Sequence, residues 1–129
     1  PDQTLLANAL KRAEGSLQIF NDPVKAVENA DVIYTDVWAS MGQEAEAQER
    51  EKVFAAFQVN DKLASYARPD YLFMHCLPAH RGSEVTDAIM DSSHSIVFHQ
   101  AENRLHIQKA ILVSLMQKNR SKDFVESGS

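Results

Sequence analysis

Short apolar segments alternate with segments of helical periodicity along the chain of 129 residues. Four apolar segments have the length of buried strands, at residues 17–20, 31–35, 71–74 and 95–98. An apolar pattern of helical spacing separates each from the next. This alternation predicts an α/β fold, a three-layer arrangement with a parallel, Rossmann-like sheet and helices on both faces.

The helical segments carry recognisable start signals. Asp2, Asp22 and Asn60 fit N-caps, and Pro23 fits the first position of a helix. Helices are expected at residues 2–14, 22–29, 43–57, 59–67 and 83–90, and a last helix, which residues 100–104 lead into, is expected to end near residue 117. The polar, Ser- and Gly-containing residues 119–129 are predicted to be a disordered tail, which leaves residues 1–118 as the ordered domain.

Each of the three best strands is followed by a polar cluster, at residues 36–42, 75–81 and 100–104. In a parallel sheet the three clusters meet at one edge, where α/β proteins bind ligands. Asp36 offers a negative charge for an amino group, and Cys76 offers a thiol that can exchange a proton. Arg104 offers a planar fork for phosphate or carboxylate, and the pattern places it in the first turn of its helix.

Metal and cofactor binding are not expected. His75, Cys76 and His80 are potential ligands, but there is no second cysteine and their spacing fits no zinc pattern. The four glycines form no phosphate-binding loop. Taken by itself, the segment around Cys76 is equally compatible with a buried cysteine before a turn.

The composition narrows the function further. The formal net charge of -5 disfavours nucleic acid as a partner, since no excess of Lys or Arg is present to neutralise phosphates. A single cysteine excludes an internal disulfide and suits a reducing, cytoplasmic compartment. No apolar run is long enough to cross a membrane, and the first residues do not have the pattern expected of a signal peptide.

Three motifs, in this order and spacing, resemble ornithine carbamoyltransferase. They are DVWASMG at residues 36–42, HCLP at residues 75–78 and ENR at residues 102–104, and the similarity covers about residues 17–116. The resemblance implies the C-terminal, ornithine-binding half of that enzyme. The carbamoyl-phosphate domain, with its SxRT loop and HPxQ segment, and the opening strand of the ornithine domain have no counterpart in this sequence.

The resemblance also implies an activity in arginine biosynthesis. The family transfers the carbamoyl group of carbamoyl phosphate to the δ-amino group of L-ornithine, which gives L-citrulline and phosphate, and it assembles as homotrimers or their multiples. Asp36 would hold the α-amino group of ornithine, and Ser40 and Met41 would contact its amino-acid end.

The same resemblance assigns carbamoyl phosphate to the second and third clusters. Cys76 would lie beside the carbamoyl carbon and the δ-amino group in a proton-transfer role. Leu77 would contribute its backbone carbonyl, Arg104 would bind carbamoyl phosphate, and the Leu77–Pro78 bond is expected to be cis. The related aspartate carbamoyltransferase reads HPLP where this chain has HCLP, and it would need a cationic group at the place of Asp36.

Two alternatives remain beside the enzyme. The chain can be a non-catalytic fragment that folds and associates but turns over nothing, or a generic α/β binding module, which the three motifs together disfavour. The last helix is apolar over more than one face, so part of this surface is expected to be unpaired in an isolated chain and to associate with another chain or a swapped helix.

Overall fold

A computed structural model describes residues 2–38 and 44–126. Its sheet consists of two parallel strands, β1 (Val32–Thr35) and β2 (Leu72–His75), with Val32 opposite Leu72 and Thr35 opposite His75. Strand β1 lies within the predicted segment 31–35, whereas β2 overlaps the predicted segment 71–74 and extends one residue beyond it, to His75. The parallel pairing with helical connections confirms the α/β class.

The helices follow the predicted order. They are α1 (Gln3–Arg12), α2 (Pro23–Val27), α3 (Glu44–Phe54) with the 3-10 turn η1 (Ala55–Phe57), α4 (Asp61–Ala64), α5 (Asp87–Met90) and α6 (Val97–Glu126). The three predicted N-caps are confirmed, because the side chains of Asp2, Asp22 and Asn60 each accept a hydrogen bond from a backbone N–H in the first turn that follows.

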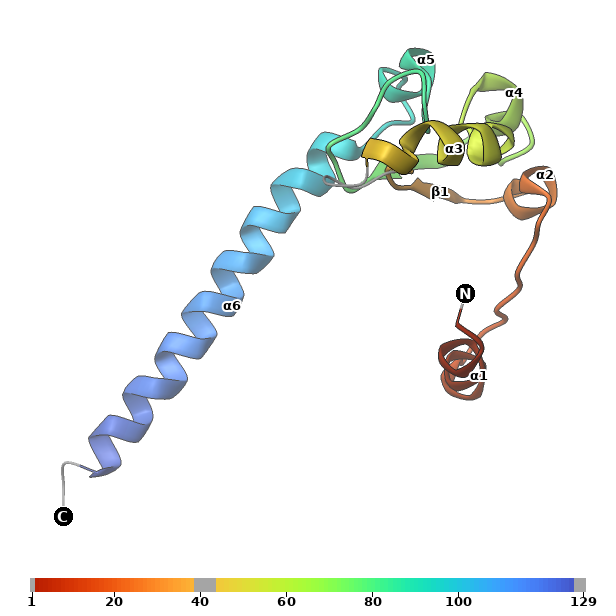
Figure 1. The fold of residues 1–129 in the computed structure, drawn as a ribbon. Helices are drawn as coiled ribbons and strands as arrows, with labels where there is room; N and C mark the ends of the chain where they lie inside the picture. The colour runs from red at the N-terminus through yellow and green to blue at the C-terminus, as the bar shows by residue number, and fades with distance from the viewer. Residues whose placement is uncertain (1, 39–43, 127–129) are drawn as a thin grey trace.

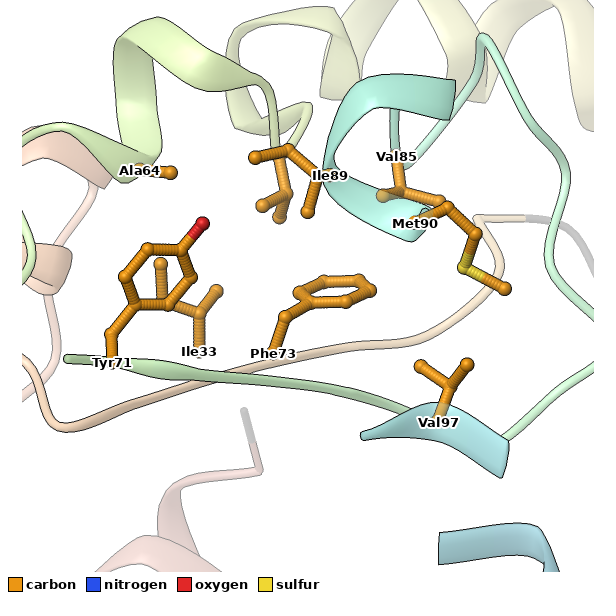
Figure 2. Packing of buried hydrophobic residues seen from close by; sticks show 9 residues of the cluster. Ile33, Ala64, Tyr71, Phe73, Val85, Ile89, Met90 and Val97 are labelled. Atoms are coloured by element: carbon orange, nitrogen blue, oxygen red, sulfur yellow. The ribbon is translucent and has the colours of Figure 1, made fainter. Parts of the chain in front are cut away.

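The core lies on one face of the sheet. Ile33 and Phe73, which are neighbours across the two strands, point toward α5 and pack with Val85 and Ile89 (Figure 2). Helices α3, α4 and α5 lie on this side, whereas α6 projects away from the body and α1 lies apart from it (Figure 1). The opposite face of the sheet is open in the described residues, and this accords with a partial domain.

The open face shows in the alternation along each strand. Ile33 and Phe73 are buried, but Val32 is 47% exposed and Leu72 is 40% exposed. A strand places successive side chains on opposite faces, so these two residues belong to the face that no described helix covers.

Two of the four predicted strands do not form. Residues 17–20 are exposed and pair with neither strand of the sheet. Of residues 95–98, Ser95 forms one parallel bridge with Phe73, and Ile96 donates its N–H to the Phe73 carbonyl. Helix α6 then begins at Val97, which is fully buried in the core.

The start of α5 and the end of α6 also differ from the prediction. Helix α5 begins only at Asp87, since residues 81–85 turn back on themselves through a bridge between Arg81 and Val85. Helix α6 extends to Glu126, beyond the end predicted near residue 117, and the disordered tail at residues 119–129 stays a prediction. No proline or glycine occurs in this stretch before Gly128, so nothing in its backbone chemistry ends the helix earlier.

Candidate functional site

The ends of β1 and β2 bring two reactive side chains into contact. Asp36 directly follows β1, and Cys76 directly follows β2. Because Thr35 and His75 are opposite each other in the parallel register, the two following residues are neighbours. The thiol of Cys76 donates a hydrogen bond to Oδ1 of Asp36 at 2.9 Å. The predicted meeting of these two residues at one sheet edge is therefore observed.

This contact sets the protonation of both groups. The hydrogen bond from Cys76, followed by one from the backbone N–H of Val37 at 2.7 Å, lowers the pKa of Asp36 below its ordinary value. The hydrogen bond to Asp36, followed by loss of water and the negative charge of Asp36, raises the pKa of Cys76, while a hydrogen bond with Tyr34 acts in the opposite direction. At neutral pH Asp36 is a carboxylate and Cys76 is a thiol.

A cavity of about 480 Å³ opens beside the thiol. Its lining consists of Tyr34, Cys76, Gln100, Ala101, Asn103, Arg104 and Ile107. The volume lies within the range of about 300–1,000 Å³ that is usual for small-molecule sites. Arg104 forms no ion pair with any residue in the described part of the chain, so its guanidinium is a cation that an anionic ligand in this cavity can meet.

Gln100 joins the three elements around the cavity. Its Oε1 accepts the backbone N–H of His75 at 3.1 Å, and its Nε2 donates to the hydroxyl of Tyr34 at 3.4 Å. It thus connects the start of α6 with the ends of both strands. Gln100 lies in a predicted polar cluster and Tyr34 in a predicted strand, but neither residue was predicted to line the site. Their involvement depends on contacts between residues far apart in sequence, and no local pattern indicates these.

The expectation for the position of Arg104 was wrong. Helix α6 begins at Val97, so Arg104 is its eighth residue and lies beyond the first turn. The electrostatic effect of a helix terminus falls off within that turn, and the dipole gives Arg104 no support. The case for an anion here rests instead on the guanidinium and the shared cavity. Ser40 and Met41 lie outside the described residues.

The turn after Cys76 has the backbone predicted for it. The Leu77–Pro78 peptide bond is cis, which confirms the expectation. Leu77 has a φ of 55°, a left-handed conformation that residues with a Cβ adopt infrequently. Its N–H donates to Nδ1 of His75 at 2.9 Å, and its side chain packs against the core.

Across residues 2–38 and 44–126, no group of three or more His, Cys, Asp or Glu side chains is arranged to hold a metal ion. None of the described helices combines the length and apolar character that a membrane span requires.

The fold and the cavity define the class of protein, an α/β ligand-binding domain with a thiol–carboxylate pair and an arginine beside its sheet edge. Residues 1–115 match the family model described as aspartate/ornithine carbamoyltransferase, Asp/Orn binding domain. The chain belongs to this family.

Relatives and solved structures support the same assignment. The chain is 61% identical over 119 residues to the anabolic ornithine carbamoyltransferase of Pyrococcus furiosus, a match that covers 90% of this chain and 38% of the relative. It is 58% identical over 106 residues to the catabolic ornithine carbamoyltransferase of Thermoplasma acidophilum, covering 82% of this chain and 35% of the relative. The chain thus spans little more than a third of the length of these relatives.

The structural comparison agrees. The structure of ornithine carbamoyltransferase from Pyrococcus furiosus superposes with a TM-score of 0.78 over 87% of this chain and 37% of that one, at 61% identity. A structure of N-acetyl-L-ornithine transcarbamylase superposes with a TM-score of 0.73 over 89% of this chain and 36% of that one, at 34% identity.

Proposed function

We propose that this chain supplies the ornithine-binding half of an ornithine carbamoyltransferase. In that reaction the δ-amino nitrogen of L-ornithine forms a bond to the carbamoyl carbon of carbamoyl phosphate, the C–O bond to phosphate breaks, and L-citrulline and phosphate result. The observation that carries the proposal is the hydrogen bond from Cys76 to Asp36, together with a cavity that both Cys76 and Arg104 line.

The charges around the thiol suit an ammonium substrate. The δ-amino group is protonated in water and must lose a proton before its nitrogen can attack. A substrate ammonium beside Cys76 offsets the charge of Asp36, so it lowers the pKa of the thiol and allows the sulfur to take part in proton transfer. Asp36 is also suited to hold the α-amino group, with Ser40 and Met41 at the amino-acid end.

Carbamoyl phosphate is the proposed second substrate, held by Arg104 together with Cys76 and the carbonyl of Leu77. The positive charge of Arg104 suits the negative charge of the phosphate. A hydrogen-bond donor held near the carbamoyl carbon would stabilise the negatively charged oxygen that forms when the nitrogen attacks. The sequence corresponds to the Asp/Orn-binding domain, so we assign turnover to its combination with a carbamoyl-phosphate domain. We further propose a homo-oligomer that works in arginine biosynthesis in the cytoplasm.

The second candidate is a folded fragment without turnover. It is favoured by the short span of the chain relative to its relatives and by the exposed apolar residues of α6. The two candidates differ in what they predict for the chain by itself and for the chain joined to a carbamoyl-phosphate domain.

The deciding experiment is a citrulline assay on two proteins. One is the 129-residue chain, and the other is a chimera in which it replaces the matching segment of the Pyrococcus furiosus enzyme. We expect little activity from the chain and citrulline formation by the chimera, with ornithine preferred over N-acetylornithine and aspartate. A Cys76→Ser chimera is the matched control and should be strongly impaired. A chimera that folds and assembles like its parent but forms no citrulline would refute the proposal.

A further inference from the structure

A buried acidic side chain lies behind the turn that carries Cys76. Glu84 is 1% exposed, and His75, which directly precedes Cys76, is also 1% exposed. Nε2 of His75 lies 3.4 Å from Oε1 of Glu84. Carboxylates are seldom fully buried, because removal from water is unfavourable unless a positive or hydrogen-donating partner compensates. A glutamate kept at this depth therefore indicates a specific partner.

Glu84 touches both ends of the turn. At the far end its Oε1 accepts a hydrogen bond from the backbone N–H of His80. At the near end it faces the imidazole of His75, and Nδ1 of that ring accepts the N–H of Leu77 at 2.9 Å. One carboxylate thus connects, directly or through the ring, three points of the segment that runs from His75 to His80.

These contacts determine the tautomer of His75. Nδ1 accepts a hydrogen bond from Leu77, so it carries no proton. The proton of the neutral ring is then on Nε2, the nitrogen that faces Glu84. A carboxylate at this place favours that tautomer, as carboxylates do for histidines in other sites where the second ring nitrogen has a fixed task.

The backbone of the turn depends on this arrangement. Leu77 has a φ of 55°, which a residue with a Cβ adopts at some energetic cost. The hydrogen bond that its N–H donates to Nδ1 of His75 helps to hold Leu77 in this conformation. If the ring proton moved to Nδ1, two N–H groups would face each other and the hydrogen bond would be lost. The thiol of Cys76, one residue before Leu77, would then no longer be held against Asp36.

We propose that Glu84 is a positioning residue for this site. Through His75 and His80 it fixes the turn in the conformation in which the thiol of Cys76 meets Asp36 and lines the cavity. The importance of this role for catalysis rests on the proposed function, but the role itself can be measured in the chain without any substrate. A negative citrulline assay would therefore leave the inference about Glu84 standing.

The test uses Glu84→Ala, which removes both acceptors, and Glu84→Gln, which removes the charge but keeps one oxygen. Glu28→Gln, an exposed glutamate at the end of α2, is the matched control. Long-range proton–nitrogen NMR of the His75 ring reports its tautomer. The rate at which Cys76, the only cysteine, reacts with an aromatic disulfide reagent reports the contact with Asp36.

We expect wild type and Glu28→Gln to show the Nε2-protonated ring and the same thiol rate. Glu84→Ala should show mixed tautomers and a thiol rate raised by about threefold, as for a thiol whose pKa falls by about one unit. Glu84→Gln should lie between the two. A folded Glu84→Ala variant with the wild-type tautomer and the wild-type thiol rate would overturn the proposal. If Glu84→Ala does not fold, Glu84→Gln decides, since a change in either readout supports the role and no change in both overturns it.

Discussion

The contact between Asp36 and Cys76 predicts how the thiol responds when the carboxylate charge is removed. Asp36→Asn keeps an oxygen that can accept the N–H of Val37, but it loses the charge that disfavours the thiolate. Two unit charges at the observed 2.9 Å interact by about 1.4 kcal/mol even with the dielectric constant of bulk water. That energy corresponds to about one pKa unit, so the pKa of Cys76 should fall by at least about that amount.

The assay is the rate of thiol modification across neutral and alkaline pH. Below the pKa of the thiol, a fall of about one unit raises the thiolate fraction about tenfold, and the weaker nucleophilicity of the less basic sulfur reduces the gain to about threefold. Asp31→Asn is the control, because Asp31 precedes β1 at its opposite end and pairs with Arg68 at 3.1 Å. A rate profile of Asp36→Asn that coincides with wild type, or is shifted to higher pH, would refute this reasoning.

The same substitution predicts a pH dependence of stability. The folded-state pKa of Asp36 lies below its ordinary value of 3.8, so the contribution of its charge to the free energy of unfolding is present above that value. It is lost as the pH falls through the lower, folded-state pKa. The difference in Tm between wild type and Asp36→Asn should be full near neutral pH and shrink in acid. A difference that stays constant into strong acid would contradict the assignment.

Three further predictions follow from the elements around the site. Gln100→Ala should lower the free energy of unfolding in urea by about 1–2 kcal/mol, because the buried N–H of His75 loses its acceptor, and Gln100→Glu, which keeps an acceptor, should lose less. In the chimera, Arg104→Gln should raise the KM for carbamoyl phosphate about tenfold or more, as expected for loss of a charge-assisted contact; an unchanged KM would remove Arg104 from the proposed site. Light scattering should show that the 129-residue chain self-associates, since Leu105, Leu112 and neighbouring apolar residues of α6 are exposed. Leu112→Lys should weaken the self-association. A monodisperse monomer at high concentration would contradict the prediction.

Local signals predicted much of the fold. The strands at residues 32–35 and 72–75 and the caps at Asp2, Asp22 and Asn60 depend on chemistry within a few residues, and all are present. Residues 17–20 have a similar apolar pattern but pair with neither strand of the sheet, and a local pattern does not show which segments will meet in the folded chain. Helix α6 begins at Val97, whose burial in the core depends on contacts between segments far apart in sequence.

In the candidate site, too, some residues could be predicted from the sequence and others could not. Asp36 and Cys76 could be placed together because residues that follow paired parallel strands must be neighbours. Glu84 and Gln100 could not, since their partners are backbone N–H groups and a ring that only the folded chain brings near. A glutamate followed by valine and threonine looks like an ordinary surface residue, and its depth becomes evident only in three dimensions.

The protonated state of Cys76 has a consequence for the durability of the molecule. Peroxides attack cysteine through its thiolate, so a sulfur held as a thiol by a neighbouring carboxylate is oxidised slowly. The carboxylate of Asp36 thus slows the oxidation of the Cys76 sulfur to sulfenic acid. A cation that binds beside Asp36 would lower the pKa of the thiol and so favour its oxidation. The same bound molecule would also limit the access of peroxide to the sulfur.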